Sequence, residues 1–323
     1  MKYYSINLPV LLLFAMCFCC LSVPVRSAQA DCIASDENCR EIGRWEFAIA
    51  LGLGGRTNPL VDGDNQPILL VPQFSWYGKY FFVDNFEVGF TLHESRTQMV
   101  NLLVQPGFDH IYFDDIGLGN FTLGDDFGRG TLSIENVTDV HNLGNGMTPN
   151  SSEDLPGTDN PDFTEQPGSD VRQELDDLET RGIAFLGGVE YSYFTEHWQL
   201  QLQLLNDVSG VHDGSEVRLS SAWDWLGGDN RFTLAAGVIW QSQELLDYYY
   251  GIDETEASNE IFVFEADEGI SSFVKFSWQK KLNRKWSLLS TLQLRKLDSS
   301  LTRSPLVEES KVATVFIGGS YHF

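Results

Sequence analysis

The sequence is poor in basic residues and, beyond its first two dozen positions, has no long hydrophobic run. It holds 21 Lys and Arg against 46 Asp and Glu in 323 residues, a formal net charge of −25. Nucleic-acid binding needs clustered Lys and Arg against phosphate, so this balance excludes a nucleic-acid partner. The missing run of about 20 apolar residues excludes a membrane-spanning helix in the mature chain. Hydrophobic residues still make up 42% and aromatics 13%, which excludes a disordered chain.

The one long apolar stretch is typical of a secretory signal. Lys2 precedes the apolar residues Leu8–Val23, and small residues at positions 28 and 30 offer a cleavage site before Asp31. We therefore predict a signal peptide over residues 1–30. Its removal takes away two basic residues and no acid, so the net charge becomes −27.

Cysteine is also scarce once this signal is removed. Of the five cysteines, Cys32 and Cys39 remain, within a short lead over residues 31–43 that we expect in the periplasm. Two cysteines in an exported chain are candidates for a disulfide. A zinc site is not indicated, because no His or further Cys lies nearby at ligand spacing.

Apolar side chains alternate with polar or small ones along segments of about ten residues. Leu200, Leu202 and Leu204, for example, alternate with Gln201 and Gln203. Alternate side chains point to opposite faces of a strand. A soluble sandwich and a transmembrane barrel both use this pattern. The segment length, the aromatic residues near the segment ends and the small or polar second face favour the barrel.

The end of the chain carries the sharpest pattern of this kind. Val315, Ile317, Tyr321 and Phe323 share one face of a predicted terminal strand, and Phe323 is the last residue of the sequence. The pattern resembles the assembly signal of Gram-negative outer-membrane barrels. We therefore expect the barrel assembly machinery and outer-membrane lipid, including lipopolysaccharide, as partners.

The fold prediction is an all-β, antiparallel transmembrane β-barrel over residues 44–323, with twelve strands and ten as the alternative. Short and long links alternate along the chain, as periplasmic turns and extracellular loops do. The predicted strands are 44–53, 68–78, 86–94, 98–105, Ile111–Leu123, 182–193, 198–207, 215–225, 231–241, 270–280, 285–296 and 312–323.

Acidic residues concentrate in the predicted loops. Residues 105–181 hold seventeen acids and three bases, and residues 242–269 hold nine acids and no base. By strand parity both segments are extracellular, and residues 125–178 look like an acidic insertion. The link at 280–285 is instead basic, with Lys280, Lys281, Arg284 and Lys285, and we predict it in the periplasm.

No motif indicates an enzyme, a cofactor or a metal site. The six His residues show no metal-ligand spacing. Asp207 and His212 lie close together in an Asp- and Gly-rich link, but catalysis by such a pair needs further partners that converge on one pocket. We predict no catalytic, cofactor-binding or metal-binding residue.

Several ordered pieces resemble the MipA/OmpV family, also called MltA-interacting proteins. They are Trp45–Gly55, Pro72–Val83, Leu205–Gly214, Tyr249–Ile252, Ser304–Val307 and Gly318–Phe323. The resemblance implies an outer-membrane barrel and supplies no catalytic residue. It also implies a scaffold that links a murein transglycosylase to a murein synthase.

Three functions follow as hypotheses for a protein of the outer membrane. The first is the non-enzymatic scaffold for peptidoglycan synthesis and remodelling. The second is a narrow channel or solute-binding barrel, suggested by Glu216, Arg218 and Arg295 on predicted lumen faces. The third is a surface adhesin that uses the acidic loops.

Overall fold

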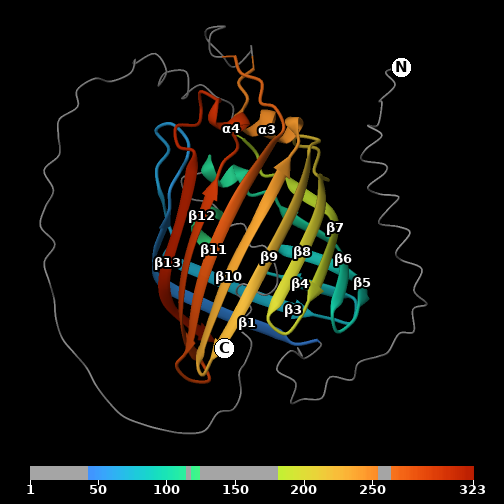
Figure 1. Cartoon of the computed structure of the whole chain (residues 1–323), viewed down its shortest axis with the longest axis vertical. Helices are drawn as coiled ribbons and strands as arrows, with labels where there is room; N and C mark the ends of the chain where they lie inside the picture. Colours follow the sequence, from blue (N-terminus) through green and yellow to red (C-terminus); the bar gives the residue numbers. More distant parts are fainter. Residues whose placement is uncertain (1–42, 114–117, 124–180, 254–262) are drawn as a thin grey trace, which may run out of the picture. The chain divides into compact units, whose positions relative to one another are not determined.

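Twelve antiparallel strands form a closed β-barrel (Figure 1). The computed structural model describes residues 43–113, 118–123, 181–253 and 263–323. The strands are β1 (Trp45–Arg56), β3 (Leu70–Tyr77), β4 (Phe81–Asp84), β5 (Glu87–Glu94), β6 (Gln98–Pro106), β7 (Phe185–Phe194), β8 (Trp198–Asp207), β9 (Ser215–Gly227), β10 (Asn230–Gln241), β11 (Gly269–Lys281), β12 (Trp286–Lys296) and β13 (Lys311–His322).

Closure comes from pairing between the first and last strands. β13 pairs with β1 from Ala48↔His322 to Arg56↔Thr314. The two-residue strand β2 (Gln66–Pro67) adds to the far end of β1. A closed ring satisfies the backbone groups between strands, which is the condition for crossing lipid with a sheet.

The alternation along each strand sorts apolar residues to the outside of the barrel. On β10, Leu234 and Val238 are each 42% exposed, whereas the inward Thr233 and Ala235 are each 4% exposed. The outer faces of the other strands follow the same rule, with Leu51, Leu53, Val88, Leu102, Val104, Phe185, Val189, Leu219, Val274, Phe276, Leu292, Leu294, Val315 and Ile317 exposed. Proteins in water rarely expose so large an apolar surface, whereas lipid requires one.

Short helices accompany the strands at the end opposite the C-terminus (Figure 1). They are the 3₁₀ helices η1 (Asp109–Tyr112) and η2 (Leu118–Phe121) and the α-helices α3 (Gln243–Tyr250) and α4 (Ser299–Thr302). Within the described ranges, none of the helices has both the length and the apolar character that a bilayer span requires.

One predicted strand is wrong, although the predicted number of twelve is confirmed. Ile111–Leu123 forms no strand in its described part, where η1 ends and η2 follows. The twelfth strand is β4, in the segment that the sequence analysis left as a link. It has only four residues, too few to show alternation. A two-residue turn joins it to β5, and Asn85 in this turn adopts φ +51°, a conformation that Asn tolerates.

The short strand β4 changes the direction assigned to β5 and β6. The link 95–97 between them lies at the end that carries the C-terminus, together with the turns at 78–80, 195–197, 228–229 and 282–285. The twelve predicted strands, taken in alternating directions, would put that link at the opposite end. The other predicted strand directions are confirmed. The added strand β4 and the missing strand at Ile111–Leu123 each reverse the alternation once, so their effects cancel.

Gly188 of β7 lies where the backbones of two neighbouring strands pack closely. A Cβ on Gly188 would lie 1.9 Å from the carbonyl oxygen of Leu204 on β8. We expect Gly188→Ala to lower the free energy of unfolding by about 1–3 kcal/mol, because the paired backbones must separate. Urea unfolding in detergent micelles measures this. Gly319→Ala is the control, since the nearest atom there is a Trp286 ring carbon at 3.6 Å. Equal effects of the two changes would contradict the prediction.

Candidate functional site

The segment after β6 turns into the barrel lumen. Asp109 and His110 of η1 are 3% and 1% exposed, and the apolar Phe108 and Ile111 beside them are 6% and 2% exposed. The predicted strand Ile111–Leu123 begins within η1, so this segment overlaps it only from Ile111 onward. Its polar side chains meet those that the strands point inward, so it forms a plug tied to the barrel wall.

Asp109 is the main polar anchor of this plug. Its carboxylate accepts a hydrogen bond from Gln241 Nε2 on β10 at 2.6 Å and from the Tyr250 hydroxyl on α3 at 2.8 Å. Arg295 on β12 lies 3.7 Å away as an ion pair and also donates to Gln241 at 3.4 Å. One buried carboxylate therefore connects the plug to two strands and to α3.

A second ion pair lies next to this anchor on β9. Glu216 pairs with Arg218, and Gln241 donates to Glu216 at 3.1 Å, which joins the two ion pairs into one network. The guanidinium of Arg218 also lies over the ring of Phe108, 5.6 Å from its centroid. The prediction that Glu216, Arg218 and Arg295 point into the lumen is confirmed.

Arg56 at the end of β1 holds the later part of the infolded segment. Its guanidinium donates to the backbone oxygens of Gly119 and Thr122, each at 3.0 Å, and to Gln66 at 3.3 Å. Gln66 in turn donates to the backbone oxygen of Ile111. The backbone acceptors of a segment without strand pairing are thus satisfied by side chains of the wall.

An apolar cluster covers this end of the barrel. It joins residues in and beside η1 and α3 to the link before β11, the link after β12 and the start of β13, namely Phe108, Ile111, Tyr112, Leu245, Leu246, Tyr249, Tyr250, Ala266, Leu297, Leu301, Val307 and Val312. Burial, helped by the nearby Asp109 carboxylate, raises the pKa of the Tyr249 and Tyr250 hydroxyls. Tyr250 therefore keeps its proton and donates a hydrogen bond to Asp109.

The lumen is filled rather than open at the levels where its polar side chains are buried. Residues around the ring are less than a tenth exposed: Asn101, Gln105, Glu190, Ser192, Gln201, Gln203, Glu216, Arg218, Ser220, Thr233, Gln241, Lys275, Ser277, Thr291, Gln293, Arg295, Thr314 and Ser320. A water-filled channel would leave its lining accessible to water.

A separate polar network lies on the lumen face of β6, β7 and β8. Glu190 of β7, 1% exposed, accepts hydrogen bonds from Asn101 at 2.8 Å, Gln201 at 2.6 Å and Gln203 at 2.9 Å. Ser192 adds a hydroxyl contact at 3.4 Å. Every donor in this network is neutral. Asp109 and Glu216, in contrast, each have an arginine as an ion-pair partner.

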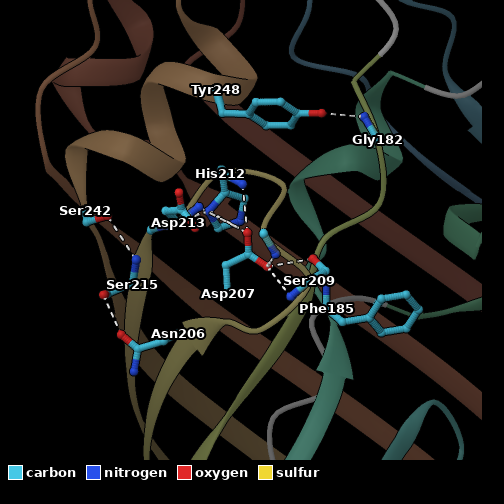
Figure 2. Close-up of polar contacts among 12 residues, drawn as sticks. Gly182, Phe185, Asn206, Asp207, Ser209, His212, Asp213, Ser215, Ser242 and Tyr248 are labelled. Atoms are coloured by element: carbon cyan, nitrogen blue, oxygen red, sulfur yellow. Dashed lines mark hydrogen bonds and ion pairs between the residues drawn. The ribbon is translucent and has the colours of Figure 1, made fainter.

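Figure 2 shows the tight link between β8 and β9, which contains the Asp207 and His212 pair. One Asp207 oxygen accepts from the backbone and hydroxyl of Ser209, at 2.8 and 2.6 Å, and from the Gly210 amide at 3.2 Å. The other accepts from the amides of His212 and Asp213, at 2.7 and 3.1 Å. The carboxylate therefore holds the shape of the turn.

His212 is a packing residue of the same turn. Its Nδ1 accepts the Gly214 amide at 2.9 Å, and its ring lies about 6 Å from those of Tyr248 and Tyr249. An imidazole whose Nδ1 accepts from a backbone amide is not set to take a proton from a substrate there. This geometry supports the expectation that the pair is not catalytic.

Acid is expected to loosen this turn. Burial lowers the pKa of His212, although Asp207, Asp109, Asp213 and Glu244 oppose the shift. The neutral imidazole is the form that accepts from Gly214, so the contribution is complete above about pH 6.5, the unfolded value, and is lost as the pH falls below it. Intrinsic amide exchange is base-catalysed and slows as the pH falls from 7 to 5, so the exchange rate of the Gly214 amide should fall by less than the intrinsic rate does, which means that its protection factor decreases. Unchanged protection would contradict this reading.

The remaining predicted site residues are placed only in part. Val315 and Ile317 are about half exposed on the outer face of β13, and Phe323 is 71% exposed at its end. Cys32 and Cys39, the predicted signal over residues 1–30 and the acidic insertion 125–178 lie outside the described residues. In the part of the chain that is described, no group of three or more His, Cys, Asp or Glu side chains is arranged to hold a metal ion.

Sequence reasoning missed the residues that organise the lumen. Glu190 lies on the inward face of a correctly predicted strand, so alternation alone could have identified it. Asp109 and Tyr250 gave no such signal, because neither lies in a strand and their contacts join segments 141 positions apart.

Known proteins similar to this chain are outer-membrane proteins. The MltA-interacting protein of Escherichia coli K12 is 24% identical over 147 residues, 45% of this chain and 59% of that protein. OmpV of Vibrio cholerae is 24% identical over 188 residues, 58% of this chain and 68% of that protein. The chain thus matches somewhat more than half the length of the first of these relatives.

Solved structures of similar arrangement are also outer-membrane barrels. An outer membrane channel from Pseudomonas putida F1 aligns with 91% of this chain and 100% of its own, with a TM-score of 0.36 and 8% identity. A TM-score at this level supports no functional argument.

The family comparison covers nearly all of the barrel. The model of the family described as MltA-interacting protein MipA matches residues 51–323, from the middle of β1 to the end of the chain. The apolar outer face and the outer-membrane relatives place the protein in the outer membrane. The chain therefore belongs to the MltA-interacting protein MipA family.

Proposed function

We propose that this protein is a non-enzymatic outer-membrane scaffold that brings a murein transglycosylase and a murein synthase together. The name of the Escherichia coli relative, MltA-interacting protein, supports an interaction with a murein enzyme. The filled lumen also supports a binding role over a transport role, since the described wall and plug leave the polar lining buried.

The observation that supports this proposal most directly is the exposed basic turn between β11 and β12. Lys280, Arg284 and Lys285 are exposed there, at the end of the barrel that carries the C-terminus. The end of β13 reaches the same turn, where the Lys285 ammonium donates a hydrogen bond to the Tyr321 hydroxyl at 3.1 Å. With this end in the periplasm, the turn offers a positive surface to an acidic face of a cell-wall enzyme.

The test is a pull-down of purified murein transglycosylase and murein synthase with the full chain in detergent. The double variant Lys280→Glu with Arg284→Glu should weaken capture by about tenfold, because it reverses the charge of two of the four basic residues at the turn. Lys296→Glu with Lys311→Glu makes the same charge change on exposed residues at the opposite end and should leave capture unchanged. Absence of capture of either enzyme by the folded wild-type barrel would overturn the proposal.

A surface adhesin is the second candidate, and it depends on acidic segments outside the described residues. Deletion of residues 141–178 should abolish attachment to host cells or surfaces if this function holds. Attachment unchanged by the deletion, with the barrel folded, would remove the candidate.

A further inference from the structure

Glu190 differs from the other lumen carboxylates in what neutralises it. Asp109 has Arg295 and Glu216 has Arg218, whereas the described contacts of Glu190 are with amide and hydroxyl groups. Within the described ranges, no Lys, Arg or His side chain forms an ion pair with Glu190. Neutral donors leave the full negative charge inside the barrel, where it attracts a cation.

The amide groups around Glu190 supply a second, independent observation. The side-chain oxygens of Asn101 and Gln201 are buried and accept no hydrogen bond, and these residues are 0% and 3% exposed. Both amides turn their nitrogens toward the carboxylate, because a carboxylate accepts hydrogen bonds and cannot donate them. Each of these amides therefore donates a hydrogen bond to Glu190 through its nitrogen, while its oxygen accepts none.

We propose that Glu190, Asn101 and Gln201 form a binding site for a hard metal cation of the calcium type. A half-turn of the two amides would bring both oxygens to the positions that their nitrogens occupy beside the carboxylate. Carboxylate and amide oxygens are the ligands that Ca²⁺ takes in proteins, at about 2.3–2.6 Å.

The charge of the site sets the expected affinity. A ligand set with one carboxylate and otherwise neutral oxygens binds Ca²⁺ weakly. We therefore expect a Kd of about 10⁻⁴ to 10⁻³ M, the weak end of protein calcium sites. The cation would join β6, β7 and β8 across the lumen, and its binding should stabilise the folded barrel. The acidic loop segments also attract Ca²⁺, so the experiment must separate their contribution from that of Glu190.

The test is thermal unfolding of the full chain in mild detergent, in 10 mM CaCl₂ against EDTA, with choline chloride as the background salt. We expect Ca²⁺ to raise the wild-type midpoint by about 2–4 °C. Glu190→Gln should lose this rise. The control Asp224→Asn should keep it, because Asp224 is a carboxylate on β9 that already has Arg231 at 3.4 Å.

A gain-of-function variant keeps the test decisive if Glu190→Gln fails to fold. Asn101→Asp adds a second carboxylate to the same place, so its affinity for Ca²⁺ should rise by about tenfold or more. An equal rise of the midpoint in wild type, Glu190→Gln and Asp224→Asn would assign the binding to the loops and overturn the proposal. No rise in wild type or in Asn101→Asp would overturn it as well.

Discussion

Replacement of Leu219 by arginine is expected to lower the free energy of unfolding by about 2–4 kcal/mol, the range for Arg or Lys near the bilayer midplane. Leu219 is 42% exposed on the outer face of β9, between Leu202 of β8 and Val238 of β10. In lipid, this exposed surface faces acyl chains, and a guanidinium there loses its hydration. In water, the same change would alter stability by about 0.5 kcal/mol or less.

Leu226 is the matched control on the same strand. It is 58% exposed beside the turn to β10 and has the parity of the inward residues Arg218 and Asp224, so an arginine there stays in water and should cost about 0–1 kcal/mol. Urea unfolding from lipid vesicles, followed by tryptophan fluorescence, compares the two variants. A Leu219→Arg protein as stable as Leu226→Arg would show that this face does not contact acyl chains.

Truncation of the plug anchor should have the other large effect. Asp109→Ala removes the buried carboxylate that pairs with Arg295 and accepts from Gln241 and Tyr250. Breaking a buried pair by removing one partner costs about 3–5 kcal/mol, because the remaining charge keeps its desolvation penalty. Asp267→Ala is the control, since the Asp267–Arg303 pair is exposed and should contribute about 0–1 kcal/mol.

The same variant tests the channel hypothesis. In planar bilayers we expect the wild-type barrel to show little conductance, because the described lumen is filled. Asp109→Ala should open the barrel more often, since it releases the plug from β10, β12 and α3. Steady wild-type conductance that the variant leaves unchanged would show that the plug does not close a path.

The barrel could be predicted from the sequence because its signal is local. An outward apolar residue and an inward polar one alternate within each long strand, so Leu219 and Arg218 already indicate their faces. The same rule found the lumen positions of Glu216 and Arg295. Lipid imposes this order on every strand of normal length, which explains why eleven of the predicted strands appear in the structure.

The plug and the short strand could not be predicted by this rule. The four residues of β4 are too few to show an alternation of apolar and polar side chains. Ile111 and Leu123, at the two ends of the predicted strand, are buried apolar residues, as strand residues often are. The side chains that hold the plug, Arg56 at Gly119 and Gln241 at Asp109, come from distant strands, so local pattern holds no information about them.

Tryptophan quenching by brominated lipid tests the central claim, that acyl chains cover the apolar outer face. Trp45, Trp223, Trp225 and Trp286 are 45–49% exposed on that face. In vesicles of lipid brominated near the headgroup end of its acyl chains, we predict a large fall in fluorescence relative to unbrominated vesicles. Fluorescence that is the same in both kinds of vesicle would contradict a lipid-facing exterior.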